Sequence, residues 1–214
     1  ARVIIRYSEI KKSLEYCKSL SEKGYKVFVQ PMVTMRYSKN ELEYLIKFCN
    51  DFSPYALYIV DSYGYMLPND VKELFSIFDK GLTKNINIGL HSHNNMNLAY
   101  SNVCEFIENS SERSIIIDST IMGMGQGAGN VQTELLVPYL NKIKKDKYDY
   151  KYVLDACEII ELFWKNNIWG YSVTNLLPAI NKTAYKFSST LRKKYKLNYA
   201  QINQLLSDIP EDYR

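Results

Sequence analysis

The 214-residue chain contains two histidines, His91 and His93, which lie two residues apart. They end an apolar stretch, Asn85–His93, that we predict to be a β-strand. Because residues i and i+2 of a strand point to the same face, both imidazoles should project together. Two adjacent neutral imidazoles suit a divalent metal ion. The alternative is a pair of hydrogen-bonded structural histidines.

Two aspartates also stand at the ends of predicted strands. Asp61 ends the stretch Tyr55–Asp61, and Asp118 ends the stretch Ser114–Asp118. Either carboxylate could balance the charge of a metal ion held by the histidines. We expect both to orient an imidazole or to cap the following helix rather than to bind the metal directly.

A glycine-rich segment follows Asp118 and leads into a predicted helix. Four glycines occur within the seven residues 123–129, including Gly125 and Gly127, and Asn130 comes next. Glycines permit positive φ and a close approach of the backbone to a ligand. Such a loop can present amides to a carboxylate or phosphate beside a helix N-terminus. The alternative is a flexible turn in which Asn130 caps the helix.

The rest of the chain predicts elements that would bring these residues to one place. Short apolar runs alternate with helical patterns, which indicates five consecutive βα units and a parallel sheet. The remaining predicted strands are Arg2–Tyr7 and Lys26–Val33; the helices of these units are Glu9–Glu22, Ser38–Asn50, Asn69–Phe78, Asn95–Glu108 and Val131–Lys144. Beyond residue 149 the pattern is helical only, over Lys151–Trp164, Val173–Lys194 and Asn198–Ser207.

Local signals mark several helix ends. Ser38 and Glu41 have the spacing of a capping box, and Asn94 or Asn95 can cap the fourth helix. Gly24 and Gly81 stand where a left-handed glycine commonly ends a helix.

Two segments together resemble a known family. HSHNNMNLAYSN (91–102) and DSTIMGMGQGAGNVQTE (118–134) are similar to the aldolase branch of the DRE-TIM metallolyases, and most of all to 4-hydroxy-2-oxovalerate aldolase-like proteins. The likeness covers about residues 2–145. Asp61-Ser62 followed by Gly64 resembles the family's DSGG strand end, and Trp169-Gly170-Tyr171 is similar to related aldolase-like proteins.

This resemblance implies a TIM barrel that binds Mn²⁺ or Mg²⁺ through His91, His93 and an aspartate, with Asn130 at or near the metal. The family's D-x-T/S-x-R-D/E motif, which supplies that aspartate on the first strand, has no match in this sequence. ARVIIRYSE corresponds to the fourth strand. We therefore expect an α/β fold consisting of the C-terminal five βα units of a (β/α)8 barrel (1–148) and a helical C-terminal extension (149–214). The catalytic residues are expected in the missing N-terminal part.

The implied function is that of a metal-dependent carbon–carbon lyase or aldolase. It would act on a small 2-oxo acid through a metal-stabilised enolate, with Asp61, Asp118, Asn130, Gly125 and Gly127 near the metal or substrate. Two alternatives remain open: a Claisen-type acyltransferase of the isopropylmalate synthase kind, and a catalytically inactive barrel fragment that serves as a binding or assembly module.

The composition of the chain indicates which partners and which cellular compartment to expect. With 27 Lys and Arg against 23 Asp and Glu, the net charge is +4, too little for a dedicated nucleic-acid binder. No apolar run approaches the length of a membrane span. Four dispersed cysteines suit a reduced, cytoplasmic protein. We expect an oligomer, and the resemblance implies an aldehyde dehydrogenase as a further partner.

Overall fold

The computed structural model describes residues 1–110 and 112–213. The chain divides into two compact units. The first comprises Ala1–Ser62, Met66–Ser92 and Ser101–Asp118, and the second comprises Tyr63–Tyr65, His93–Tyr100 and Ser119–Arg214. The predicted boundary at residue 148 separates the barrel part from the helical extension along the sequence, whereas these two units are built from interleaved segments. That boundary stays a prediction.

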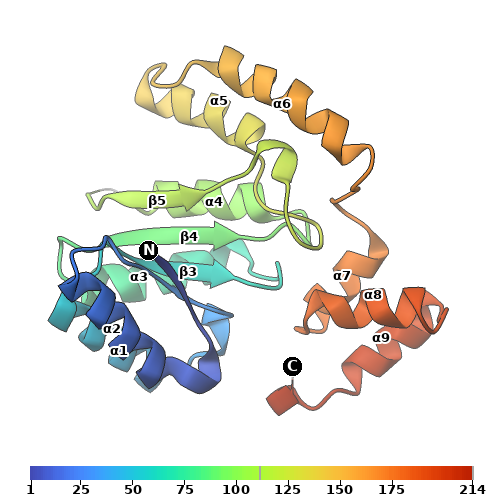
Figure 1. Cartoon of the computed structure of the whole chain (residues 1–214), viewed down its shortest axis with the longest axis horizontal. Coiled ribbons are helices and arrows are strands. Elements are labelled where there is room, and N and C mark those ends of the chain that lie inside the picture. The colour runs from blue at the N-terminus through green and yellow to red at the C-terminus, as the bar shows by residue number, and fades with distance from the viewer. Residues whose placement is uncertain (111, 214) are drawn as a thin grey trace. The chain divides into compact units, whose positions relative to one another are not determined.

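The first unit contains a five-stranded parallel sheet in the order β1-β2-β3-β4-β5 (Figure 1). Its strands are β1 (Arg2–Ile5), β2 (Phe28–Pro31), β3 (Ala56–Asp61), β4 (Asn87–Ser92) and β5 (Ile115–Asp118). The helices between them are α1 (Ile10–Glu22), α2 (Lys39–Phe52), α3 (Pro68–Gly81) and α4 (Ala99–Glu108), with 3-10 turns at Tyr7–Glu9 and Thr34–Arg36. The predicted α/β class and the order of its elements are confirmed.

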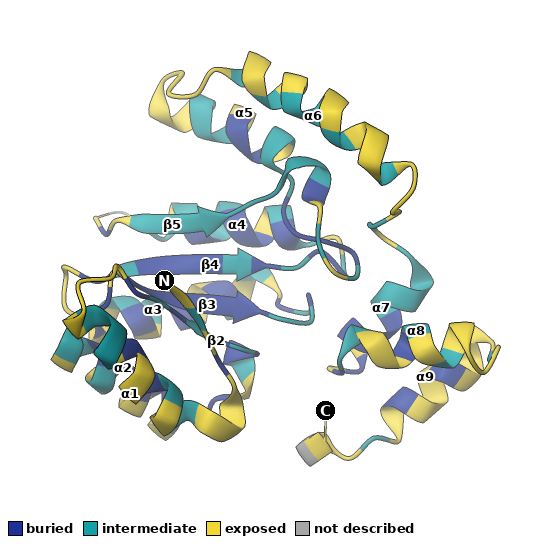
Figure 2. Ribbon diagram, viewed as in Figure 1, coloured by how far each residue is buried: buried dark blue, intermediate teal, exposed yellow. Residues whose placement is uncertain are grey.

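The central strand β3 is buried on both faces (Figure 2). Ala56, Tyr58 and Val60 form one apolar cluster with Phe28 and Ile116. Because side chains alternate along a strand, Leu57 and Ile59, both fully buried, point to the opposite face. The near-continuous apolar run of the sequence reflects this burial on two sides.

Helix-end signals in the first unit are mostly confirmed. Ser38 and Glu41 form a capping box, with the Ser38 N–H donating to the Glu41 carboxylate over 2.8 Å. Gly24 has φ +84° after α1. Gly81 differs from the prediction, because it lies inside the last turn of α3 rather than beyond it. A Cβ there would lie 2.9 Å from Ile46 Cγ2, so the glycine allows α3 to pack closely against α2.

The second unit consists of strand-end loops and helices. Its helices are α5 (Thr133–Lys144), α6 (Tyr150–Trp164), α7 (Val173–Ile180), α8 (Tyr185–Lys193) and α9 (Tyr199–Ser207), with 3-10 turns at Ile121–Gly123 and Glu211–Tyr213. No helix in the part of the chain that the structure describes has the length and apolar character needed to cross a membrane.

The predicted helix Val173–Lys194 is wrong, because the chain reverses after α7. Lys182 has φ +54°, and Thr183 N–H donates to Pro178 O. The reversal lets Leu177 of α7 join Ile202 and Leu206 of α9 in an apolar cluster. Tertiary packing therefore overrides a sequence that is helical on both sides of the break.

The helix predicted from Asn95 begins four residues later. Asn97 has φ +58°, and Asn94 Oδ1 accepts the Ala99 N–H at 3.2 Å. Asn94 thus bonds the first amide of α4 from five residues before it, not from the predicted N-cap position, and the residues that follow Asn94 form a turn rather than helix.

β1 lies at the edge of the sheet. The backbone N–H and C=O groups of its odd-numbered residues point toward β2, since Phe28 N–H donates to Ala1 O and Met32 N–H donates to Ile5 O. The backbone groups of Arg2 and Ile4 therefore point away from β2, and Ile4 is 61% exposed. β1 and α1 border a groove lined by Ile4, Tyr16 and Tyr25.

The 214 residues expressed alone should be poorly soluble, oligomeric or dependent on a second polypeptide, because the β1 edge is unpaired. Hydrogen exchange should be faster at the Arg2 and Ile4 amides than at Val3 and Ile5. Size-exclusion chromatography combined with exchange measurements tests this. A well-behaved monomer with a protected Ile4 amide would contradict it.

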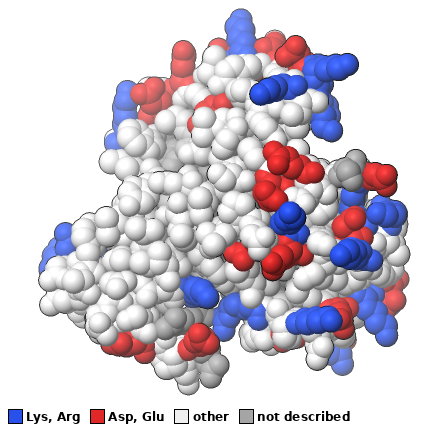
Figure 3. All heavy atoms as spheres, turned by 180° about the vertical axis from the view of Figure 1, so that it is seen from behind, with Lys and Arg blue, Asp and Glu red and all other residues white. Residues whose placement is uncertain are grey.

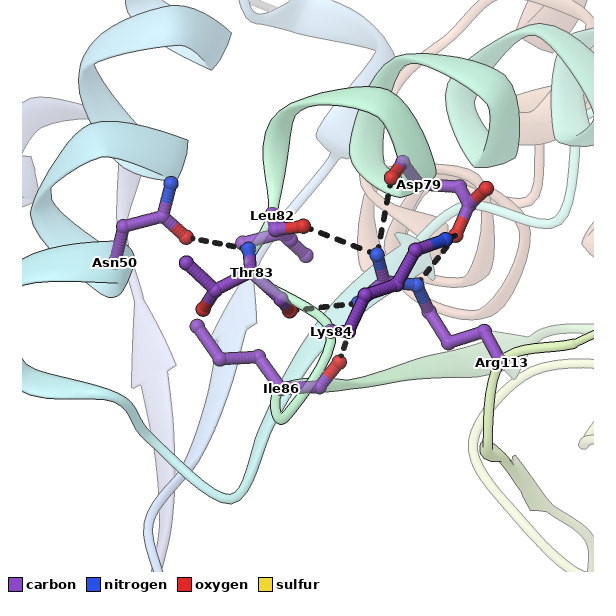
Figure 4. A network of polar contacts seen from close by, with 7 residues as sticks. All are labelled: Asn50, Asp79, Leu82, Thr83, Lys84, Ile86 and Arg113. Atoms are coloured by element: carbon purple, nitrogen blue, oxygen red, sulfur yellow. Dashed lines mark hydrogen bonds and ion pairs between the residues drawn. The ribbon is translucent and has the colours of Figure 1, made fainter.

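Arg113 joins the end of α3 to the start of β4 (Figure 4). Its side chain is 1% exposed, and its Nε donates to the Asp79 carboxylate. Its Nη1 donates to Thr83 O and Ile86 O, and its Nη2 to Asp79 O and Leu82 O, over 2.8–3.0 Å. All five N–H donors of the guanidinium are thereby used. The bond from Arg113 lowers the pKa of Asp79 although burial opposes ionisation, and Lys84 adds to the effect.

Replacing Arg113 with Lys should lower the free energy of unfolding by about 3 kcal/mol, since an ammonium cannot satisfy this set of carbonyls. The Asp79 contribution is present above its unfolded pKa near 3.8 and is lost as pH falls through the lower folded pKa. In urea titrations, the deficit of Asp79→Asn should therefore shrink below about pH 4. A deficit that does not depend on pH would refute this reading.

Candidate functional site

In the first unit, His91 and Asp118 are opposite each other on neighbouring strands. The register of β4 and β5 pairs these two residues directly. His91 Nδ1 lies 3.1 Å from Asp118 Oδ2. An ionised carboxylate only accepts hydrogen bonds, so Nδ1 carries the proton of a neutral His91 and Nε2 keeps its lone pair. Asp118 thus sets the tautomer that a metal ligand needs.

Two residues that the sequence did not single out hold Asp118. Arg2 of β1 bonds both carboxylate oxygens, with Nη2 at 2.8 Å from Oδ1. The Tyr58 hydroxyl donates to the same oxygen over 3.2 Å. The guanidinium also stacks on Phe28 and Tyr58, with ring centroids 5.2 and 5.3 Å away. Burial alone would raise the pKa of Asp118, but the bonds from His91 and Arg2 outweigh it and lower the pKa to about 2.

Asp61 lies on the other face of the sheet from His91. Tyr58 and Val60 belong to the cluster on one face, so Asp61 points the opposite way. It is 1% exposed and accepts the Met66 N–H at 3.2 Å. Asn102 Nδ2 donates to Met66 O over 2.9 Å. Asp61 therefore holds the turn after β3, and the structure does not bring it to His91.

In the second unit, His93 lies beside the end of the glycine loop. His93 and Asn130 form an antiparallel bridge, and Asn94 N–H donates to Gly129 O over 2.8 Å. The strand-end segment after β4 is therefore hydrogen-bonded along residues 129–130. Among the predicted site residues, the structure brings this pair together.

The glycine loop is folded tightly on itself. Gly127 has φ +65° and Gly129 has φ +82°. A Cβ on Gly129 would overlap the carbonyl oxygen of Gly123, and one on Gly125 would overlap Nδ2 of Asn130. These positions need glycine for conformation and for space, so the segment is not a plain linker.

The alternative in which Asn130 caps the helix is wrong, because α5 begins at Thr133 with Gln132 as its N-cap residue. The amides of residues 122, 123, 124, 129 and 130 donate to groups of this same segment or to the Glu134 carboxylate. The stretch 125–128 therefore remains the candidate for presenting amides to an anion.

The side-chain oxygen of Asn130 is a buried hydrogen-bond acceptor. Its N–H donates to Gly123 O at 3.0 Å, and its Nδ2 donates to Met124 O at 3.1 Å. Its Oδ1 is buried and has no hydrogen-bond partner within the part of the chain that the structure describes. A bound ion is one of the physical explanations for a buried acceptor of this kind. Its neighbour in the bridge, His93, offers an imidazole.

This donor set fits a divalent cation in part. Imidazole nitrogens and a neutral amide oxygen are suitable ligands. No group of three His, Cys, Asp or Glu side chains that could hold a metal forms among residues 1–110 and 112–213.

The helical extension contacts the glycine loop, which the sequence did not predict. Trp169 Nε1 donates to Met122 O over 2.8 Å. Asn95 Nδ2 donates to Asn175 O over 2.8 Å, and Asn175 Nδ2 donates to Gly170 O over 2.9 Å. The similarity noted at Trp169-Gly170 is the signal that marked this segment.

Comparison with known proteins identifies a matching family model and similar sequences. The family model described as HMGL-like matches residues 5–162. The 4-hydroxy-2-oxovalerate aldolase of Bacillus thuringiensis is 31% identical over 161 residues, which cover 75% of this chain and 44% of the relative. That of Pectobacterium atrosepticum is 39% identical over 107 residues, covering 50% and 30%. The chain thus spans less than half the length of these curated relatives.

Solved structures share the fold. The N-terminal domain of a presumed aldolase from Bacteroides vulgatus has a TM-score of 0.84 at 24% identity, covering 95% of this chain and 66% of that one. The carboxyl transferase domain of Rhizobium etli pyruvate carboxylase has a TM-score of 0.71 at 14% identity, covering 97% and 37%. The latter match includes the helical extension.

The glycines of the loop should differ in what they tolerate. Gly24→Ala is the matched control, because Gly24 has positive φ but nothing within 4 Å of a Cβ. Gly127→Val should cost about 1–3 kcal/mol from strain at positive φ. Gly129→Ala should cost more than Gly24→Ala, since it adds an overlap with backbone. Gly125→Val should displace Asn130. Thermal and urea unfolding measure the series, and equal losses throughout would mean that the loop is only a linker.

Proposed function

Because the chain belongs to the HMGL-like family, we propose that the protein is a divalent-metal-dependent carbon–carbon lyase that acts on a small 2-oxo acid. The relatives named 4-hydroxy-2-oxovalerate aldolase support this reaction class. The observation that carries the proposal is the bridge between His93 and Asn130, whose Oδ1 is buried and unpartnered. That oxygen and the paired histidines are donors that suit a divalent cation.

His91, His93 and Asn130 would hold Mn²⁺ or Mg²⁺ together with a carboxylate from outside the described residues. His91 and His93 are two residues apart in the chain, so both imidazoles can reach one ion. The bound cation supplies a Lewis acid for the 2-oxo group when the carbon–carbon bond breaks.

Residues next to these donors orient them. Asp118, held by Arg2 and Tyr58, fixes the His91 tautomer. Gly125 leaves the space that Nδ2 of Asn130 occupies. The residues that transfer the proton are expected outside these 214 residues, as is an arginine that would neutralise developing negative charge.

The setting of the enzyme forms part of the proposal. We place it in the cytoplasm, as an oligomer, with an aldehyde dehydrogenase as a further partner. Lys, Arg, Asp and Glu are intermixed on the face shown in Figure 3, which gives no support to a nucleic-acid partner.

A binding or assembly module without catalysis is the second candidate. The described residues contain no group of three His, Cys, Asp or Glu able to hold a metal, and this favours it. The full-length gene distinguishes the two: an upstream D-x-T-x-R segment indicates the enzyme.

Replacing His91 or His93 with Ala in the full-length polypeptide should abolish specific Mn²⁺ uptake. Since neutral imidazole is the ligand, affinity should fall as the pH is lowered. Metal analysis and titration calorimetry measure both effects, and unchanged stoichiometry would reject the ligand assignment.

Asp118→Asn should weaken Mn²⁺ binding by about 10–100-fold, because the amide can present its NH₂ to Nδ1 and select the wrong tautomer. Asp79→Asn is the matched control, since Asp79 is also paired with an arginine but holds the α3–β4 turn. Equal effects of the two variants would show that Asp118 acts only through general stability.

A further inference from the structure

We propose that Trp169, in the segment between α6 and α7, is a positioning residue for Asn130. By fixing the loop 121–130 it keeps Oδ1 of Asn130 directed at the bound cation. This rests on the proposed function, because it takes Asn130 as an oxygen donor to the metal.

The first step concerns Met122, whose backbone N–H and C=O groups are both hydrogen-bonded to side chains. Its carbonyl accepts the indole N–H of Trp169 at 2.8 Å, and its N–H donates to the Glu134 carboxylate over 2.9 Å. Met122 has φ +53°, a left-handed conformation that costs about 1 kcal/mol for a residue with a side chain. Such a conformation persists where the surroundings enforce it.

The second step leads from Met122 to Asn130 within the same loop. Gly123 O accepts the Asn130 N–H, and Gly129 runs so close to Gly123 O that no Cβ fits. Trp169 Cδ1 lies 3.5 Å from the position a Gly129 Cβ would take. The indole therefore lies against the returning arm of the loop as well as bonding its outgoing arm.

The third step concerns the orientation of the Asn130 amide. Nδ2 is bound to Met124 O, two residues after the peptide that Trp169 holds. If Met122–Met124 shifted, the amide would lose this bond and could rotate by half a turn. The NH₂ would then occupy the place of Oδ1, and an NH₂ cannot bind a cation.

Trp169 is itself fixed from its own segment. Trp164 Nε1 donates to Trp169 O over 3.1 Å, and Asn175 Nδ2 donates to Gly170 O over 2.9 Å. Its neighbours Ile168 and Tyr171 are exposed, at 78% and 55%. The backbone that carries the Trp169 indole is thus held by hydrogen bonds from Trp164 and from Asn175.

The test is Trp169→Phe in the full-length polypeptide, which keeps an aromatic ring but removes the N–H donor. Mn²⁺ affinity, measured by calorimetry, should fall about tenfold, the lower end for a lost supporting contact. Tyr171→Phe, an exposed aromatic two residues away, should bind Mn²⁺ as the wild type does. In the metal-free protein, amides 123–130 should exchange faster in Trp169→Phe.

A double-mutant cycle separates positioning from general stability. In an Asn130→Ala background, Trp169→Phe should cause no further loss of Mn²⁺ affinity. Glu134→Ala, which releases the Met122 N–H from the α5 side, should show the same dependence on Asn130 and serves where Trp169→Phe does not fold. An equal loss in both backgrounds, or wild-type affinity in Trp169→Phe and Glu134→Ala, overturns the inference.

Failure of the inference can be told from failure of the proposed function. If Asn130→Ala leaves Mn²⁺ affinity unchanged, the inference falls while the histidines can still bind the metal. If His91→Ala and His93→Ala also leave it unchanged, the proposed function falls with it.

Discussion

The ion pair between Arg2 and Asp118 joins the first and the fifth strand of one sheet. In a flat sheet these strands would lie about 19 Å apart, farther than an arginine side chain reaches. The sheet must therefore curve toward the face that carries Arg2, Tyr58, His91 and Asp118. Curvature of this kind is what a parallel barrel requires, and it turns one sheet face into an interior with polar groups. The tautomer of His91 depends on this geometry, since Asp118 is charged and fixed by residues from β1 and β3.

Glycine has a comparable role in the second unit, where space rather than charge is the constraint. The loop 121–130 closes so tightly that a methyl group at Gly125 or Gly129 would overlap Asn130 or the backbone. The amides of residues 122–124, 129 and 130 donate within the segment or to the Glu134 carboxylate, and one acceptor, Oδ1 of Asn130, is buried without a partner among the described residues. This oxygen is therefore the group of the loop that could bind a cation, whereas the stretch 125–128 is the candidate for presenting amides to an anion.

Features that depend on local sequence patterns could be predicted, whereas contacts between residues far apart in the sequence could not. The βα alternation, the capping box at Ser38 and the bridge-forming pair His93 and Asn130 were accessible from spacing or from the family resemblance. Arg2 was not, because its partner Asp118 lies 116 residues away and nothing in RVII marks the bond. Trp169 reaches Met122 across 47 residues for the same reason. The break after α7 follows from burial of Leu177 against α9, which a helical pattern cannot show.

One further parallel strand beside β1 would account both for the edge of β1 and for the carboxylate that the proposed metal site needs. Arg2 and Ile4 direct their backbone N–H and C=O groups away from β2, to the side of β1 on which no strand pairs among the described residues. A further parallel strand beside β1 would satisfy those groups. Its carboxyl end would lie at the same edge of the sheet as the ends of β1–β5, because parallel strands share direction. That edge is where His91 and Asp118 stand, so the strand that completes the backbone pairing is also well placed to supply a carboxylate.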